Sequence, residues 1–153
     1  MVNVRMAKTD DAESILNITK EAFADYVQLA GISDTAALHE DIDTIINDIN
    51  TKAVYVACVN DTVVGSVRIK KTAENTAYLS RFGVSNEHQN LGIGKTLIDA
   101  VDADMFKSGI KFLELHTASK AASLIHFYYN RGFYIDSTSK DMGYVRAKMV
   151  KEY

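Results

Sequence analysis

Two glycines, Gly92 and Gly94, stand two residues apart between a polar loop and a segment with helical periodicity. The loop follows an apolar run that ends at Val84, so the glycines lie where a strand gives way to a helix. The first turn of a helix presents free backbone N–H groups and the positive end of its dipole. Glycines there let a phosphate approach the backbone closely. The segment is predicted to bind a phosphorylated ligand, with a tight turn that binds nothing as the alternative.

Three phosphate-binding motifs compete for this segment. A P-loop ends in Gly-Lys-Thr, as residues 94–96 do, but its first glycine would have to stand at Gln89. A dinucleotide-binding fingerprint requires glycine or alanine where Leu97 stands, and this loop follows a fourth strand rather than opening the chain. The remaining pattern, Gln/Arg-x-x-Gly-x-Gly/Ala, is met in full by residues 89–94.

With this third pattern the chain resembles the GNAT superfamily of acyl-CoA-dependent N-acyltransferases. A second segment, Phe127–Phe133, is similar to that family's Phe-Tyr-x-x-x-Gly-Phe signature at the end of its last helix. Either motif alone is weak, but the two together, in the expected elements, are specific. The expected order of elements also matches, so the resemblance covers essentially the whole chain. It implies the acyl-CoA N-acyltransferase fold and a single N-acetyltransferase domain over residues 1–153.

The resemblance implies acetyl-CoA as co-substrate, with its pyrophosphate on the loop and its pantetheine arm along the strand that ends at Val84. The cofactor-binding residues so implied are Phe82, Val84, Gln89, Asn90, Leu91, Gly92, Ile93, Gly94 and Lys95. A backbone N–H near Phe82 would polarise the thioester carbonyl, where negative charge grows as an amine attacks. Tyr128 matches the family's general acid for the leaving thiolate, and a core aromatic residue is the alternative reading.

The general base is left open. Some family members carry a glutamate on the fourth strand, but residues 76–82 hold no carboxylate. Glu114 and His116 share a face of the next strand, and the ordinary pKa of histidine suits a base. A histidine satisfied by a neighbour and a water chain are equally open readings. The chain also departs from the family at Ala121, Leu124 and Asn86, where asparagine, alanine and proline are common.

The implied acceptor is a primary amine of a small molecule or peptide, which attacks the thioester directly. Five residues could line its pocket or equally be solvated surface residues: Asp25, Tyr26, Glu40, Asp41 and Tyr144. A non-catalytic acyl-CoA-binding regulatory module is the alternative function. A nucleotide hydrolase, suggested by Gly-Lys-Thr alone, is a third hypothesis.

Hydrophobic periodicity predicts the elements that must position these residues. The expected strands are 3–6, 53–59, 63–71, 77–84, 112–117, 133–137 and 144–150, and the expected helices run from Thr9 to Gly31 and over 34–50, 94–108 and 121–130. Asn60-Asp61 has the residue types of a hairpin turn. This order indicates a single-domain α/β fold, a mixed, mostly antiparallel sheet flanked by helices on both faces.

The composition argues against several classes of binding partner. The 153 residues carry a net charge of -3 without a basic run, which argues against nucleic-acid binding. The single cysteine, Cys58, allows no intrachain disulfide, and the four scattered histidines indicate no metal site. No apolar run has membrane length and the N-terminus lacks an apolar leader, so a cytoplasmic protein without a membrane partner is expected. A homodimer is compatible with the sequence.

Overall fold

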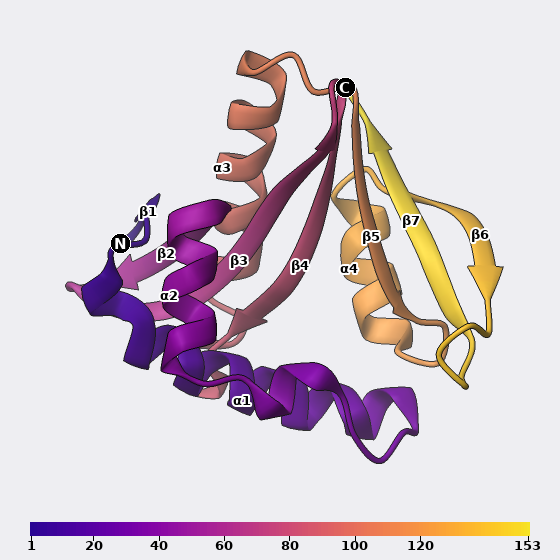
Figure 1. Ribbon diagram of the computed structural model, residues 1–153, viewed down its shortest axis with the longest axis horizontal. Helices are drawn as coiled ribbons and strands as arrows, with labels where there is room; N and C mark the ends of the chain where they lie inside the picture. Colours follow the sequence, from indigo (N-terminus) through magenta and orange to yellow (C-terminus); the bar gives the residue numbers. More distant parts are fainter.

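The computed structural model describes residues 1–153 and contains a seven-stranded sheet with two helices on each face (Figure 1). The strands are β1 (Val2–Met6), β2 (Ala53–Val59), β3 (Thr62–Ala73), β4 (Thr76–Val84), β5 (Phe112–Ala118), β6 (Tyr134–Ser139) and β7 (Arg146–Glu152). The helices are α1 (Ala12–Ala30), α2 (Ile42–Thr51), α3 (Ile93–Lys107) and α4 (Ala122–Asn130). Short 3₁₀ turns precede α1, α2 and α3.

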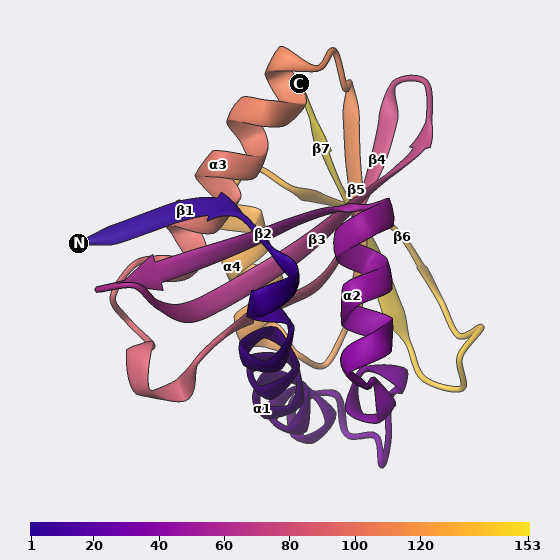
Figure 2. The same cartoon turned by 60° about the vertical axis from the view of Figure 1, so that its left-hand side comes forward.

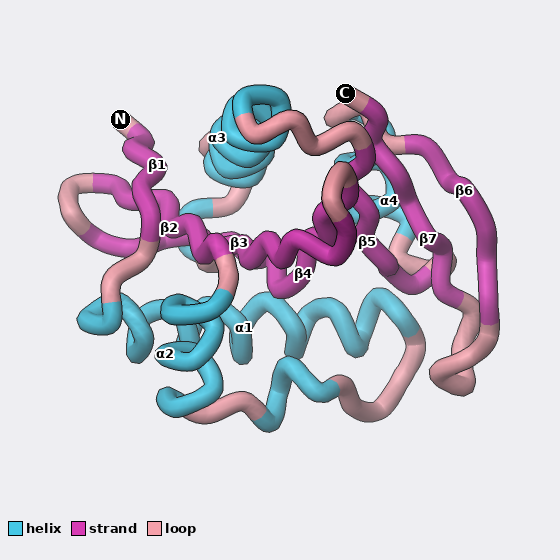
Figure 3. The backbone as a smooth tube through the Cα atoms, turned by 45° about the horizontal axis from the view of Figure 1, so that its top comes forward, coloured by secondary structure: helices cyan, strands magenta, loops and turns pink.

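The sheet has the order β1-β2-β3-β4-β5-β7-β6, and only the β4–β5 pair is parallel. This confirms the predicted single-domain α/β fold with a mixed, mostly antiparallel sheet. Figure 3 shows the layers, with α1 and α2 beneath the sheet and α3 above it. Figure 2 shows α1, seen nearly end-on, beside α2 on the same side of the strands.

Alternating side chains of the strands produce a core on each face. The larger core lies under α3 and α4 and includes Leu97, Val101 and Leu113, all fully buried. A smaller core under α1 and α2 packs Ile15 and Ile45 against β2. The turn of the β2–β3 hairpin has positive φ angles at Asn60 and Asp61, +49° and +67°, as a two-residue turn of this kind requires.

The predicted helix 34–50 is wrong in its first half. A 3₁₀ turn covers Ala36–His39, the chain is extended at Glu40, and α2 begins only at Ile42. Asp41 caps α2 by accepting a hydrogen bond of 2.9 Å from the backbone N–H of Thr44. The break turns the Glu40 side chain towards the sheet, where two arginines bind it.

Candidate active site

A cleft opens where β4 and β5 diverge. The two strands pair only at their beginnings, Thr76–Tyr78 with Phe112–Glu114. Beyond that point β4 continues to Val84 with a strand partner on its β3 side alone, and Figure 1 shows the strands spreading apart towards α1. The backbone groups on the β5 side of Leu79–Val84 therefore have no strand partner within the sheet.

A bulge in β4 sharpens this divergence. Ser80 pairs with Arg68 of β3 and Gly83 pairs with Ser66, so Arg81 and the following phenylalanine oppose a single residue of β3. Arg81 has a φ of +54°, a strained left-handed conformation for a residue with a large side chain. Its Nε donates a hydrogen bond of 2.9 Å to Glu40, which fixes the side chain on the α1 side of the sheet.

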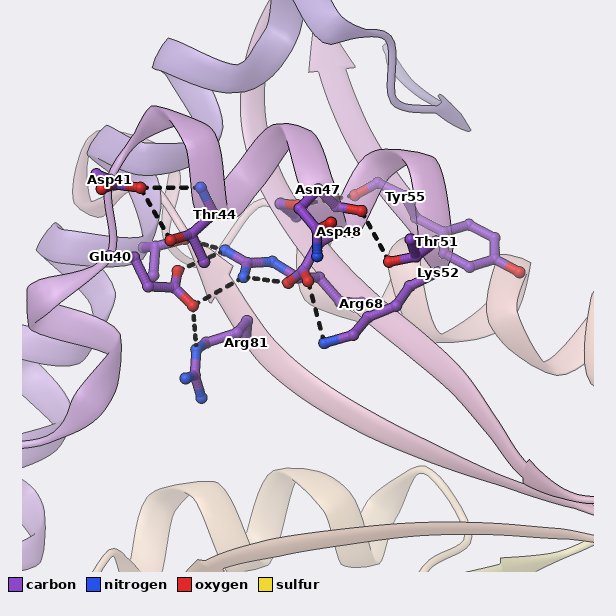
Figure 4. A network of polar contacts seen from close by, with 12 residues as sticks. Glu40, Asp41, Thr44, Asn47, Asp48, Thr51, Lys52, Tyr55, Arg68 and Arg81 are labelled. Atoms are coloured by element: carbon purple, nitrogen blue, oxygen red, sulfur yellow. Dashed lines mark hydrogen bonds and ion pairs between the residues drawn. The ribbon is translucent and has the colours of Figure 1, made fainter.

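The anchor of this bulge is a buried ion network between β3 and the α2 region (Figure 4). Arg68 is 1% exposed, and both of its terminal nitrogens donate hydrogen bonds of 2.9 Å to the Glu40 carboxylate. Arg68 also binds Asp48 at 2.8 Å, and Asp48 contacts Lys52 at 3.2 Å. Glu40 is therefore shared by Arg68 and Arg81, and the network ties the start of α2 to the bulge of β4.

The cleft has a volume of about 1350 Å³ and runs from the α3 N-terminus, past β4 and α4, to the end of α1 and the start of β7. Of the sequence-predicted cofactor residues and general acid, Phe82, Val84, Gln89, Asn90, Gly92, Ile93, Gly94, Lys95 and Tyr128 line it. Leu91 is 60% exposed and lies outside the lining.

The loop before α3 and the first turn of α3 present a row of unused donors. None of the backbone N–H groups from Gln89 to Lys95 forms a hydrogen bond within the protein. The Gln89 side chain donates its own hydrogen bond, 3.0 Å, to the backbone carbonyl of Val84 and so holds the loop against the end of β4. Lys95 is paired with Asp99 at 2.7 Å, an exposed contact. The arrangement suits an anion with several acceptor oxygens.

The two glycines of the loop have different roles. Gly92 has a φ of +73° at the helix N-cap, and a Cβ there would meet nothing within 4 Å. A Cβ on Gly94 would lie 2.8 Å from the Phe82 ring and 3.3 Å from the Phe127 ring. Gly92 is therefore required for its left-handed backbone conformation, which residues with a Cβ rarely adopt. Gly94 allows α3 to pack closely against aromatic side chains of β4 and α4.

Tyr128 of α4 lies in that aromatic cluster. Its ring contacts Phe82, Phe127 and Phe133, with centroid distances of 5.9, 5.4 and 5.6 Å. The residue is 5% exposed and borders the cleft, and its hydroxyl forms no hydrogen bond within the protein. Burial raises the pKa of this phenol, so at neutral pH it carries its proton.

His116 and Glu114, which share a face of β5, have different surroundings. His116 lines the cleft, and its Nδ1 lies 2.6 Å from the Tyr78 hydroxyl. Burial, assisted by the nearby Arg146 cation, lowers the pKa of His116, so the ring is neutral at pH 7. Glu114 lies outside the cleft lining and pairs with Lys148 at 3.2 Å.

Of the residues predicted to bind the acceptor, some line the cleft and others do not. Asp25, Tyr26 and Tyr144 line the cleft, and the two tyrosine hydroxyls lie 3.2 Å apart. Glu40 is enclosed by the arginine network and Asp41 is an exposed helix cap, so neither lines the cleft.

The cleft residues that sequence reasoning missed include Tyr78, Arg81 and Arg146. Only Arg68, the buried arginine behind them, left a local signal, because it stands between the apolar residues Val67 and Ile69. Arg81 and Arg146 come from segments far apart in the sequence and gave none. The structure contains no cluster of three or more histidine, cysteine or acidic side chains arranged to hold a metal ion. None of its helices combines the length and the apolar character that a membrane crossing requires.

Comparison with known proteins gives consistent results. A family model described as "Acetyltransferase (GNAT) family" matches residues 13–133. The S-(2-succino)cysteine N-acetyltransferase of Bacillus subtilis (strain 168) is 26% identical over 147 residues, covering 91% of this chain and 87% of the relative. The spermidine N(1)-acetyltransferase of Thermoplasma acidophilum is 25% identical over 149 residues, covering 90% of this chain and 91% of the relative.

The fold comparison agrees. The crystal structure of the PaiA N-acetyltransferase of Thermoplasma acidophilum in complex with coenzyme A superposes with a TM-score of 0.87. The match covers 100% of this chain and 99% of that one, at 24% sequence identity, and it shows that the two proteins share a fold.

Proposed function

The chain belongs to the GNAT family of acetyltransferases, and from this membership we propose that it moves an acetyl group from acetyl-CoA to a primary amine of a small molecule or peptide. The protein is an acetyl-CoA-dependent N-acyltransferase, and its relatives named above act on a cysteine derivative and on spermidine. We assign the activity to a single domain over residues 1–153. A cytoplasmic location is part of the proposal, supported by the free, buried thiol of Cys58.

The observation that carries the proposal is the row of unpaired backbone N–H groups from Gln89 to Lys95 at the mouth of the cleft. These donors and the α3 dipole fit a pyrophosphate, which offers several anionic oxygens. Gly92 carries no side chain that could block the approach, and the space that a Cβ would occupy there is open. Leu91, which points outside the cleft lining, would contribute through its backbone only.

The free edge of β4 fits the rest of the acyl donor. An extended amide-containing chain can pair with an unpartnered strand edge through main-chain hydrogen bonds. The backbone of Phe82 and Val84 lies on the part of β4 that β5 leaves uncovered. A backbone N–H near Phe82, at the bulge, would stabilise the negative charge that develops on the thioester oxygen.

Two side chains suit the proton transfers. Tyr128 is protonated, buried and without a hydrogen-bond partner in the protein, so its hydroxyl can donate to the departing thiolate. His116 is neutral, and a Nδ1–H donated to Tyr78 would leave Nε2 as an acceptor for a proton of the attacking amine. The amine would then attack the thioester directly, without an acyl-enzyme intermediate.

The test is a coupled assay of thiol release and product mass. Acetyl-CoA is incubated with the protein and a panel of primary amines, and free coenzyme A is followed with a thiol reagent. The proposal predicts amine-dependent release and a product 42 Da heavier than the amine, the mass added by one acetyl group. Thiol release that no amine accelerates, or a protein that itself becomes stably acetylated and passes on no acetyl group, would contradict it.

A further inference from the structure

Arg146 occupies the wall of the cleft at the start of β7. Its backbone pairs with Ala118 at the end of β5, so it follows His116 on the same side of the sheet. The hydroxyl of Tyr26 accepts a hydrogen bond of 3.0 Å from the Ala118 N–H, and Tyr144 lies two residues before Arg146. Arg146 is therefore part of the half of the cleft that adjoins α1, away from the loop that precedes α3.

Most of the hydrogen-bonding capacity of Arg146 is unused. A guanidinium has five N–H donors in a planar fork. In Arg146 only Nη2 has a partner, and it contacts both oxygens of Asp141 at 3.3 and 3.2 Å. Nε is buried without any partner. Asp141 is 59% exposed on the turn before β7, so this long, single-nitrogen contact leaves Arg146 available to a second carboxylate.

A second cation borders the same space. Arg81 uses Nε for Glu40, and its two terminal nitrogens point away from the network (Figure 4) and have no partner in the protein. The acidic groups of the lining are Asp25, exposed on α1, and Asp34, which is already held by His39 at 2.7 Å. In the half of the cleft that adjoins α1, the side chains with unpaired charged donors are thus the cations Arg81 and Arg146. This favours an anionic group on the acceptor over a second ammonium group.

We propose that Arg146 binds a carboxylate of the acceptor, so that the substrate is an amine of the amino-acid class rather than a polyamine. The inference rests on the proposed N-acetyltransferase function and names its substrate class. In an α-amino acid the amine and the carboxylate are attached to one carbon. Arg146 would hold the carboxylate while the amine faces His116, which lies on the same side of β5. The guanidinium is a specificity-determining group, and it takes part in no proton transfer.

The experiment compares each amino acid with its own α-carboxamide, which keeps the side chain and the amine but lacks the negative charge of the α-carboxylate. L-Methionine, L-phenylalanine and L-glutamate are assayed against the corresponding α-carboxamides with acetyl-CoA, and spermidine serves as the polyamine. The measured quantity is the ratio of kcat/KM for acid over amide. Because both values come from one preparation, the ratio does not depend on how much of a variant is folded.

The proposal predicts that Arg146→Gln lowers this ratio about 10- to 100-fold, the size of a lost charge-assisted hydrogen bond. Arg146→Lys, which keeps the charge but loses the fork, is expected to fall between the wild type and Arg146→Gln. Lys140→Gln is the matched control. It removes one positive charge from the connection that leads into β7 but lies outside the cleft lining, and it should leave the ratio as it is.

Two results would overturn the inference alone: an acid-to-amide ratio that is the same in Arg146→Gln and the wild type, or a wild type that acetylates spermidine and the carboxamides faster than every amino acid. A different result bears on the proposed function. If the wild type transfers acetyl to none of these amines, with or without a carboxylate, the transferase proposal fails and the substrate class fails with it.

Discussion

The buried ion network behind the β4 bulge gives an asymmetric prediction for two substitutions. Three cations, Arg68, Arg81 and Lys52, surround two carboxylates, Glu40 and Asp48. Glu40→Gln would leave one carboxylate for three cations, with Arg81 unpaired. Arg68→Met would leave two separate pairs, Glu40 with Arg81 and Asp48 with Lys52. Removing the shared carboxylate should therefore destabilise the fold more than removing the shared arginine.

The magnitudes follow from burial. The Glu40 side chain is 8% exposed and Arg68 is 1% exposed, and removing one partner of a buried pair costs about 3 to 5 kcal/mol. For a domain of this size that loss lowers Tm by about 6 to 20 °C. Arg68→Met replaces a charge with an apolar chain of similar length, and its cost should be less than half of that.

Urea unfolding at pH 7, followed by circular dichroism, measures both free energies of unfolding. Asp34→Asn is the control, since it removes a carboxylate from an exposed pair with His39 and should leave stability unchanged. A loss for Arg68→Met equal to or larger than that for Glu40→Gln would refute the reasoning.

Three further substitutions test the site. Tyr128→Phe removes a hydroxyl that has no hydrogen-bond partner in the protein, so it should leave the affinity for acetyl-CoA nearly unchanged. In the thiol-release assay it should lower kcat about 100-fold. An unaltered kcat would remove Tyr128 from the mechanism. Gly94→Ala should cost about 1 to 3 kcal/mol in urea unfolding, because the new Cβ meets the Phe82 ring at 2.8 Å, and weaker acetyl-CoA binding by calorimetry should accompany it. The pKa of His116 is lowered in the folded protein, so the unfolded chain binds this proton more readily and the free energy of unfolding should fall as pH drops below about 6.5. His116→Gln should flatten this dependence of stability on pH. A dependence identical to that of the wild type would show that other groups cause it.

Local signals in the sequence were sufficient for much of the fold. Asn60-Asp61 was identified as a turn because few other residues accept positive φ, and both residues have it. The end of α1 at Gly31 and the start of α3 next to Gly92 followed from the same kind of local chemistry. Fold class and element order were predictable because periodicity and turn residues are read within short windows.

The shape of the cleft was not predictable in this way. Glu40 lies 28 residues from Arg68 and 41 residues from Arg81, and no short window contains Glu40 together with either arginine. Their contact interrupts the predicted second helix and holds a strained Arg81 in β4. Arg146 likewise lies beside His116 only because β7 pairs with β5. A pattern within one element cannot show which side chains two distant elements bring together.

The most direct test of the central claim is isothermal titration of the protein with acetyl-CoA, followed by a separate titration with ATP and Mg²⁺. The account predicts one acetyl-CoA bound per chain in the micromolar range, through the backbone donors of residues 89–95, and no binding of the nucleotide. Failure to bind acetyl-CoA by a folded protein would contradict it, as would tighter binding of ATP than of acetyl-CoA.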